Sequence, residues 1–503
     1  MAQPVVGRGV PNTVRLALLR GRAWVSGRWV EAASGKTFPV LNPANGELIA
    51  EVPDMGVSDT EEAIEAAHKA QRQWAALPCK ERAKGLGRWY DAIMANKEEL
   101  AKLITVEAGK VLRESRGEVD YGASFISWNA EEAKRIEGEV LSSLVPGRRT
   151  LLVSQPVGVA ALVTPWNFPV AMITRKAGPA LAAGCAVVVK PSEETPFSAL
   201  AIAELAHEAG IPPGVFNVVT SSRDSTPSVG TTLASSDLVR KLSFTGSTTV
   251  GKLLMAQCAS TVKKVSLELG GNAPLLIFNS ADIDQAVAGA MASKFRNTGQ
   301  TCICTNRILV QRGVHDEFVE KLVSAVSKLV QGNPFDESSQ QGPLINEAAA
   351  QKVENHVNDA VEKGAELLVG GARAEELGSL FFRPSVAVGV SGEMRVTCEE
   401  TFGPLAAVMT FDDEEEGITM ANATPFGLAG YFYSGDPGQI WRVSEALETG
   451  MVGVNETMIT SENTIFGGMK QSGLGKEGGR YGLREYLETK FVCMGGIAER
   501  PVD

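Results

Sequence analysis

Short apolar runs of β-strand character alternate with helical patterns between residues 157 and 269, and few architectures accommodate such a pattern. The strand-like runs cover residues 159–164, 186–189, 215–219, 241–244 and 265–269. Short, continuously apolar strands joined by helices are typical of a parallel sheet that is covered on both faces. The sequence therefore predicts an α/β fold with a doubly wound sheet. Ligands bind outside the carboxyl ends of the strands in such sheets, so we expect the loops after Thr164, Val189 and Phe244 to line a site.

The rest of the chain extends this pattern. Residues 23–55 and 148–163 carry strand signals, and residues 59–140 are mostly helical. After Gly271 the alternation begins again, which predicts a second α/β lobe. Its helical patterns cover residues 282–297, 314–331, 346–363 and 437–448, and its strand patterns cover residues 303–311, 381–389, 404–411 and 428–433.

Charge and composition exclude several classes of function. The formal net charge of −11 disfavours a nucleic acid or an anionic membrane as partner. The longest apolar candidate, residues 177–189, is too short to span a membrane and is typical of a buried helix and strand. With four His and no HExxH or CxxC motif, we expect no metal site and no Ser-His-Asp triad.

Cysteine usage and the N-terminus bear on the compartment. The seven Cys are scattered and fit no disulfide framework, which indicates a reducing compartment, the cytoplasm. The first 22 residues contain Arg8, Arg15, Arg20 and Arg22 and no acidic residue. This segment is either a basic N-terminal arm or a weak mitochondrial presequence, so the mitochondrial matrix is the alternative location.

Two glycine-rich segments resemble nucleotide-binding motifs without their context. Residues 473–478 match GxGxxG, but no βαβ unit follows them. Residues 246–252 nearly match a P-loop, but Leu253 stands where a Ser or Thr would contact Mg²⁺. Because the second segment follows a strand and opens a helix, its free N–H groups can still hold a phosphate.

Three residues at strand or helix ends are candidates for catalysis. Cys302 follows a helix and a Gly turn, where a thiolate can be a nucleophile or a Cys can simply be buried. Glu268 ends an apolar strand, so poor solvation would raise its pKa toward that of a general base; a salt-bridged acid is the alternative. Asn167 lies in a turn between two prolines and offers an amide N–H to an oxyanion, although Asn is also a common turn residue.

These segments occur together in the order seen in the aldehyde dehydrogenase superfamily, which the chain resembles from about residue 24 to residue 494. The motifs are Thr164-Pro-Trp-Asn-Phe-Pro169, Val189-Lys-Pro-Ser-Glu-Glu194, Phe244-Thr-Gly-Ser247, Leu267-Glu-Leu-Gly-Gly271, Gly299-Gln-Thr-Cys302 and Glu400-Thr-Phe-Gly-Pro404. Within the superfamily, finer matches resemble the succinate-semialdehyde dehydrogenases. They are Met172-Ile-Thr-Arg-Lys176, the run from Lys294 to Cys304, and the run from Phe466 to Gly475.

The resemblance implies a covalent mechanism. Cys302 would attack an aldehyde to give a thiohemiacetal, with Asn167 and the Cys302 N–H holding the oxyanion. Hydride transfer would leave a thioester, and Glu268 would activate the water that hydrolyses it. Relatives that transfer the acyl group to coenzyme A usually lack this Glu, so its presence favours hydrolysis.

The resemblance also implies a dinucleotide cofactor. A carboxylate at Glu193 would accept ribose hydroxyl groups and repel a 2′-phosphate, which favours NAD over NADP. Lys190 and Ser192 leave NADP as the weaker alternative. The implied cofactor-binding residues are Trp166, Lys190, Ser192, Glu193, Gly246, Ser247, Glu400 and Phe402.

The implied substrate is a small aldehyde that carries a carboxylate, most closely succinate semialdehyde. Arg175, Arg296 and Ser461 resemble the residues that hold its distal carboxylate, because guanidinium binds carboxylate bidentately. Without the resemblance, the two arginines would read as surface ion pairs. Cys304 resembles the second thiol of a Cys-X-Cys pair that closes an inactivating disulfide in some relatives, and a spectator thiol is the alternative.

The superfamily fold implies three parts. They are an NAD-binding, Rossmann-like domain (residues 1–133 and 157–267), an α/β catalytic domain (268–479) and a small β oligomerisation extension (134–156 and 480–503). The resemblance implies a homo-oligomer, with a tetramer favoured over a dimer, and a role in 4-aminobutyrate degradation. The alternatives are a dehydrogenase for glutarate semialdehyde, one methylene longer, and a homologue without catalysis.

Overall fold

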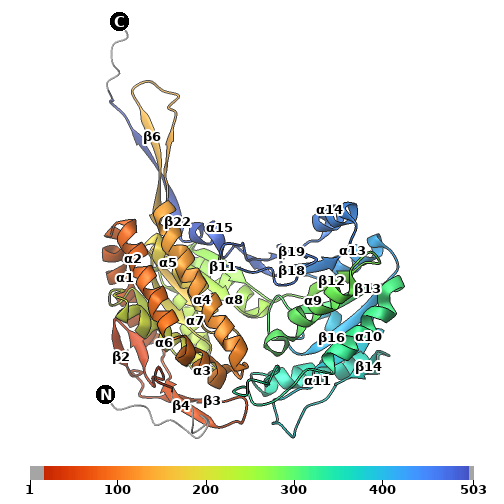
Figure 1. Cartoon of the computed structure of the whole chain (residues 1–503). Helices are drawn as coiled ribbons and strands as arrows, with labels where there is room; N and C mark the ends of the chain where they lie inside the picture. The colour runs from red at the N-terminus through yellow and green to blue at the C-terminus, as the bar shows by residue number, and fades with distance from the viewer. Residues whose placement is uncertain (1–15, 498–503) are drawn as a thin grey trace.

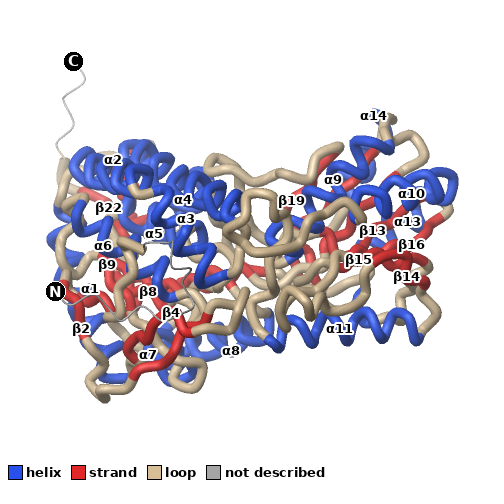
Figure 2. Tube along the Cα trace, turned by 60° about the horizontal axis from the view of Figure 1, so that its bottom comes forward, coloured by secondary structure: helices blue, strands red, loops and turns tan. Residues whose placement is uncertain are grey.

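The computed structural model describes residues 16–497 and consists of two α/β lobes and a projecting β extension (Figure 1). Each lobe is a sheet between layers of helices, as Figure 2 shows. Arg8 and Arg15 of the basic N-terminal segment lie outside the described residues, as do residues 498–503 of the expected extension. Among residues 16–497, no helix combines the length and apolar character that a bilayer crossing requires.

The first lobe contains the predicted doubly wound sheet. Its eight strands lie in the order β2 (Arg28–Val30), β1 (Ala23–Val25), β9 (Phe216–Val218), β8 (Ala186–Lys190), β7 (Val159–Val163), β10 (Val239–Thr245), β11 (Lys264–Glu268) and β21 (Gly473–Leu474). The five strands from β9 to β11 are parallel, as expected. β21 pairs antiparallel with β11, so the GxGxxG segment forms a sheet edge and no dinucleotide turn.

Helices cover both faces of this sheet because its central strands are apolar on both sides. In β7, Ala160 and Leu162 face the core shared with α2 (Cys79–Ala95), α5 (Ala171–Ala183) and α6 (Pro196–Glu208). Val159 and Ala161 face the opposite core, beneath α1 (Val57–Ala76) and α7 (Thr226–Ser235). The remaining helices of this lobe are α3 (Lys97–Ala108), α4 (Leu112–Glu132) and α8 (Thr248–Cys258).

The second lobe is a seven-stranded sheet that is parallel except for its edge strand β14. Its order is β14 (Glu366–Val369), β15 (Ser385–Val388), β16 (Leu405–Phe411), β13 (Thr305–Gln311), β12 (Ala273–Ile277), β18 (Ala429–Tyr433) and β19 (Met451–Val454). Its helices are α9 (Ile283–Phe295), α10 (His315–Val326), α11 (Glu347–Glu362), α12 (Arg395–Cys398), α13 (Glu414–Asn422) and α14 (Pro437–Ala446). The sequence analysis missed β12, β14 and β19, whose short runs follow glycines and carry no alternation.

The extension is a three-stranded antiparallel sheet of segments far apart in the chain. It consists of β5 (Glu139–Leu141), β6 (Arg149–Pro156) and β22 (Leu487–Met494), with α15 (Gly479–Arg484) at its base. β6 and β22 project away from both lobes (Figure 1). Two further small sheets pair β3 (Thr37–Leu41) with β4 (Leu48–Pro53) and β17 (Phe426–Gly427) with β20 (Met469–Lys470).

Candidate active site

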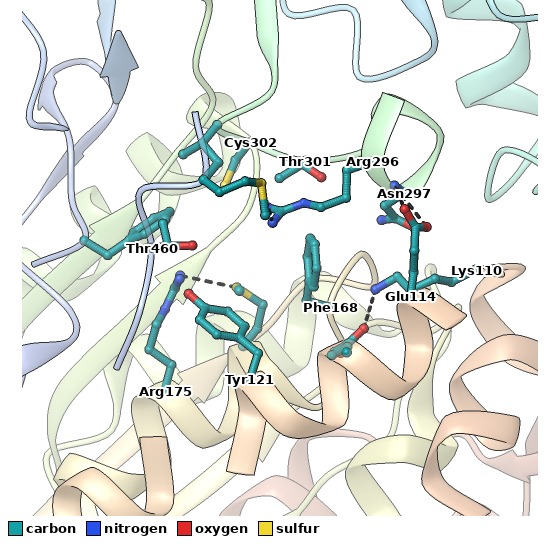
Figure 3. Close-up of a pocket in the computed structure, with 16 residues that line it drawn as sticks. Lys110, Glu114, Tyr121, Phe168, Arg175, Arg296, Asn297, Thr301, Cys302 and Thr460 are labelled. Atoms are coloured by element: carbon teal, nitrogen blue, oxygen red, sulfur yellow. Dashed lines mark hydrogen bonds and ion pairs between the residues drawn. The ribbon is translucent and has the colours of Figure 1, made fainter. Parts of the chain in front are cut away.

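A cavity of about 310 Å³ lies where the two lobes meet. Arg175 and Tyr121 extend into it from the helices of the first lobe, and Arg296 and Cys302 face them from the second (Figure 3). The cavity is lined by Lys110, Glu114, Gly117, Glu118, Tyr121, Phe168, Met172, Arg175, Arg296, Asn297, Thr301, Cys302, Ile303, Met458, Thr460 and Phe466. The structure thus brings the predicted nucleophile and both predicted arginines to one cavity.

Cys302 lies between the short 3₁₀ turn η3 (Arg296–Gly299) and β13, and its side chain is partly exposed to the cavity. The next residue, Ile303, is anchored because its carbonyl accepts a hydrogen bond of 2.8 Å from the Tyr431 hydroxyl. Burial raises the pKa of the Cys302 thiol to about 12, and the positive charge of Arg175 only partly opposes this effect. The thiol is therefore protonated at neutral pH and needs a base, rather than being activated by neighbouring cations alone.

Glu268 is the last residue of β11, and its side chain is buried. Neither carboxylate oxygen has a hydrogen-bond partner among residues 16–497. Burial and the nearby Glu477 charge raise the pKa of Glu268 well above its usual range, although Arg175 and Lys176 act in the opposite direction. The raised pKa agrees with the sequence prediction and suits a general base near neutral pH.

Asn167 follows β7 and is held from both lobes. Its Nδ2 donates a hydrogen bond of 3.0 Å to the carbonyl of Gln300, two residues before Cys302. The backbone carbonyl of Asn167 accepts hydrogen bonds from Lys110 Nζ at 2.8 Å and Asn297 Nδ2 at 3.2 Å. An amide nitrogen carries two hydrogens, so one N–H of Asn167 is left for an oxyanion beside Cys302.

The two predicted arginines differ in their partners. Arg175 is buried, donates from Nε to Glu477 Oε2 at 2.6 Å and stacks 4.0 Å from the Phe466 ring centre. No carboxylate among residues 16–497 forms an ion pair with Arg296, whose guanidinium lies 5.6 Å from the Phe168 ring centre. Arg296 therefore has no direct ion pair in the described chain, and the carboxylate of Glu114, which also lines the cavity, interacts with it electrostatically.

The structure does not bring Ser461 to the cavity lining. The Ser461 hydroxyl donates to Asn463 Oδ1 at 2.6 Å, and the neighbouring Thr460 lines the cavity instead. Cys304 is buried, and its thiol donates to the carbonyls of Ser293 at 2.8 Å and Lys294 at 3.2 Å. Both Cys302 and Cys304 are free thiols.

The carboxyl ends of β7, β8 and β10 carry the residues expected to hold the cofactor. Lys190 ends β8, and its Nζ lies 3.8 Å from Glu193 Oε2, while the Ser192 hydroxyl lies 3.5 Å from the same oxygen. Ser247 caps α8 by accepting a hydrogen bond from the Val250 N–H, and Gly246 precedes it at the end of β10.

The predicted cofactor residues Glu400 and Phe402, which lie between α12 and β16, contact Gly271 and Trp166. Glu400 accepts a hydrogen bond of 3.4 Å from the Gly271 N–H, and burial raises its pKa to about 7. Phe402, held at φ +56°, meets the ring of Trp166 edge-on at 5.5 Å.

The residues present fit a dinucleotide. The buried hydroxyls of Thr164 and Thr245, at the ends of β7 and β10, have no hydrogen-bond partner among the described residues. The free N–H groups at the start of α8 suit a pyrophosphate. Within residues 16–497, no group of three or more His, Cys, Asp or Glu side chains is arranged to hold a metal ion.

Several residues of the site escaped the sequence analysis. Lys110, Glu114 and Glu118 line the cavity from α4 and the residues before it, and nothing local in their sequence indicates this. Glu477 lies inside the misleading GxGxxG segment, and its carboxylate binds both Arg175 and Lys176. The only sequence signal that could have indicated Glu477 is an acidic residue among glycines in a segment that forms a sheet edge.

Comparisons with known proteins agree with this geometry. The model of the aldehyde dehydrogenase family matches residues 29–492. The mitochondrial succinate-semialdehyde dehydrogenase of Homo sapiens is 56% identical over 482 residues, which are 96% of this chain and 90% of that protein. The glutarate-semialdehyde dehydrogenase of Pseudomonas aeruginosa is 55% identical over 480 residues, 95% of this chain and 99% of that protein.

The structural comparison leads to the same family. A crystal structure of an NADP-dependent enzyme of E. coli has a TM-score of 0.94 and 53% sequence identity, and the match covers 96% of this chain and 100% of that one. A family match over most of the length, together with relatives above half identity, agrees with a cavity that is lined by the predicted nucleophile Cys302. The chain therefore belongs to the aldehyde dehydrogenase family.

Proposed function

We propose that the protein oxidises succinate semialdehyde to succinate with NAD. The observation that carries the proposal is the cavity itself, which places a cysteine thiol and two guanidinium groups, Arg175 and Arg296, around one small volume. A short aldehyde with a carboxylate at its far end matches this arrangement. The similarity to the human succinate-semialdehyde dehydrogenase supports the same substrate.

The proposed chemistry begins at Cys302. The Cys302 thiol gives its proton to solvent, its sulfur attacks the aldehyde carbon, and the resulting oxyanion accepts hydrogen bonds from the free N–H of Asn167 and the Cys302 N–H. A bound nicotinamide dinucleotide supplies the hydride acceptor that converts the thiohemiacetal into a thioester. Glu268 takes a proton from a water molecule, the hydroxide adds to the thioester carbon, and the Cys302 thiolate leaves as the acid forms.

The electrostatics of the cavity support a carboxylated substrate. Arg296 has no ion-pair partner in the described chain, whereas the charge of Arg175 is shared with Glu477. A substrate carboxylate would supply the missing anion for Arg296 and would bind it bidentately. A neutral aldehyde would leave Arg296 without an ion pair.

Replacing Arg296 by alanine should lower kcat/KM for succinate semialdehyde about ten- to a hundredfold, because a charge-assisted hydrogen bond contributes roughly 1.5–3 kcal/mol. The rate with a neutral aldehyde of similar length should change less than about threefold. Arg296 is the better test residue, since removing Arg175 would leave Glu477 with one fewer buried cation. Steady-state formation of NADH with both aldehydes measures the effect.

The matched control is Arg312→Ala, which removes an equal charge from an exposed ion pair with Asp412 and should leave both rates unchanged. Equal losses on neutral and carboxylated aldehydes in the Arg296 variant would contradict the substrate proposal. Glutarate semialdehyde is the second candidate because of the 55% identical P. aeruginosa relative. One methylene changes binding by only about 1–3 kcal/mol, so both semialdehydes are compared in the same assay.

The preference for NAD rests on Glu193, whose carboxylate would lie beside the adenosine ribose next to Lys190. Glu193→Ser should raise the kcat/KM ratio of NADP over NAD about ten- to a hundredfold, because a like charge beside the 2′-phosphate is removed. Glu208→Ser, at an exposed position on α6, is the matched charge control. An unchanged ratio in Glu193→Ser would remove the physical basis for NAD selectivity.

Assembly and role follow as parts of the same proposal. The extension exposes large apolar side chains, including Val140, Leu144 and Phe491, which supports burial against other copies in a homotetramer. The scattered cysteines support a reducing compartment, the cytoplasm or the mitochondrial matrix. Oxidation of succinate semialdehyde would complete the degradation of 4-aminobutyrate.

A further inference from the structure

Two carboxylates line a cavity that is proposed to bind an anion, and neither has been given a role. Glu114 and Glu118 lie four residues apart on α4, so they share one face of that helix. Unpaired carboxylates there would repel the carboxylate of the substrate. Their hydrogen bonds show why both are compatible with the cavity, and these bonds lead to the catalytic residues.

Glu118 and Lys110 hold the turn that carries Asn167. The two side chains form a buried ion pair, which cancels the Glu118 charge. Glu118 Oε1 accepts the N–H groups of Val170 at 2.9 Å and Ala171 at 3.4 Å, at the start of α5. Lys110 Nζ donates to the Asn167 carbonyl at 2.8 Å and lies 3.9 Å from the Phe168 ring centre. The Lys110–Glu118 pair therefore holds both ends of the segment 167–171 by hydrogen bonds.

Glu114 holds the facing segment of the second lobe. Its two carboxylate oxygens accept the Asn297 N–H at 3.0 and 3.1 Å. Asn297 and Thr298 both have left-handed backbones, with φ of 51° and 55°. Non-glycine residues in this region are strained and persist only where surrounding contacts hold them. Glu114 is one of these contacts, and the strained turn lies between Arg296 and Cys302.

The contacts of the Lys110–Glu118 pair and those of Glu114 are linked at the backbone carbonyl of Asn167. Asn297 Nδ2 donates at 3.2 Å to the Asn167 carbonyl and also at 3.2 Å to the Gln300 carbonyl, which in turn accepts the Asn167 side chain. Asn167 belongs to one lobe, and Gln300 and Cys302 belong to the other. The spacing between the oxyanion donor and the nucleophile is therefore a spacing between lobes, and α4 contacts both sides of it.

We propose that Glu114 and Glu118, with Lys110, are positioning residues that hold Asn167 and the Cys302 loop in one geometry across the two lobes. They act through Asn167 and Asn297. The inference rests on the proposed function, because it assigns Asn167 to the oxyanion.

Glu118→Gln should lower kcat about ten- to a hundredfold with less than about a threefold change in KM for the semialdehyde. The reason is that loss of an oxyanion donor costs about 10²–10³ in kcat, and a displacement of about 1 Å costs up to about 10². Glu114→Gln should show the same split between kcat and KM. Rates are measured at saturating dinucleotide, and folding is followed by thermal unfolding.

A double-mutant cycle separates positioning from a general loss of stability. If Glu118 acts through Asn167, Glu118→Gln should change kcat less than about threefold in an Asn167→Ala background. The variant Lys110→Met/Glu118→Gln removes both charges together, which avoids an unpaired buried charge if the single variant folds poorly. It should show the same loss of kcat.

The chain also offers a matched control. Glu107 is a buried carboxylate that accepts the N–H groups of Phe197 at 2.8 Å and Ser198 at 2.9 Å at the start of α6, away from the cavity. Glu107→Gln should lose similar stability and keep kcat within about twofold. A kcat loss in this control equal to that in Glu118→Gln would overturn the inference, because destabilisation alone would then explain both.

The outcomes distinguish this inference from the proposed function. A large loss of kcat in Asn167→Ala, together with unchanged kcat in Glu118→Gln and Glu114→Gln, overturns the positioning role and leaves the proposed chemistry intact. Equal factors for Glu118→Gln in both backgrounds also overturn it. An Asn167→Ala variant with full activity overturns the oxyanion assignment and the inference with it.

Discussion

Replacing Cys302 by alanine should lower kcat for aldehyde oxidation by at least about 10⁴-fold. Loss of a nucleophile that forms a covalent intermediate removes the reaction path itself, and such changes have cost about 10⁶ in another enzyme. Among the described residues that line the cavity, Cys302 is the only cysteine. Formation of NADH with the semialdehyde, at enzyme concentrations high enough to follow a slow rate, measures the loss.

Cys304→Ala is the matched control, because it removes a thiol two residues away that is buried and bonded to backbone carbonyls. It should keep kcat within about threefold. A Cys302→Ala variant with more than about a tenth of the native rate would contradict the covalent mechanism.

The Cys304→Ala variant also tests whether Cys302 and Cys304 close an inactivating disulfide. Peroxide inactivation that dithiothreitol reverses should occur in the native protein, and Cys304→Ala should lose this reversibility.

Replacing Glu268 by glutamine should leave one rapid equivalent of NADH per active site and slow the following turnovers about 10²–10⁴-fold. A general base contributes about this factor, and here it serves the hydrolysis of the thioester. The first equivalent forms before hydrolysis, so it should survive the change. Rapid-mixing measurements of NADH followed by the steady state separate the two phases.

The pH dependence gives a second measure of the same residue. Burial raises the pKa of Glu268, and only the deprotonated carboxylate can act as base. The native kcat should therefore rise with pH over a range above the one in which an ordinary carboxyl group titrates. Burial also raises the pKa of the Cys302 thiol to about 12, which adds to the rise of kcat/KM.

Two results would contradict this account of Glu268. Loss of the rapid equivalent in Glu268→Gln would place the carboxylate in an earlier step, such as removal of the thiol proton. A native kcat that does not rise with pH above the range in which an ordinary carboxyl group titrates would contradict its action as a base of raised pKa. Glu107→Gln again serves as control, since burial raises the pKa of Glu107 to about 8 in a carboxyl group outside the cavity.

Local patterns predicted most of the first lobe. The five parallel strands from β9 to β11 and the helices between them were expected, because apolar runs bounded by turns leave few alternatives in a chain of this length. The short buried strand β12 escaped prediction although it lies near the centre of its sheet. Five apolar residues have no periodicity of their own, and only pairing with β13 and β18 makes them a strand.

The predicted catalytic residues could be named from motifs, but their electrostatics could not. The position of Glu268 at a strand end suggested poor solvation, and the structure shows that both its oxygens lack partners in the described chain. Glu477, which raises the pKa of Glu268 further, lies 209 positions later in the sequence. A pKa depends on which charges are close in space, so no local pattern contains it.

The sequence by itself determined the α/β class and the order of the motifs, because these depend on local periodicity and on residue types at strand ends. The resemblance that the motifs carry named Cys302, Glu268 and Asn167 as candidates. Only the tertiary structure decided which charges share the cavity: it leaves Arg296 without an ion pair, ties Arg175 to Glu477, and places Thr460 rather than Ser461 at the lining. The physical reason is that the cavity lies between two lobes. Its walls come from α4, α5, η3 and the loop after β19, and their spacing depends on long-range packing and hydrogen bonds.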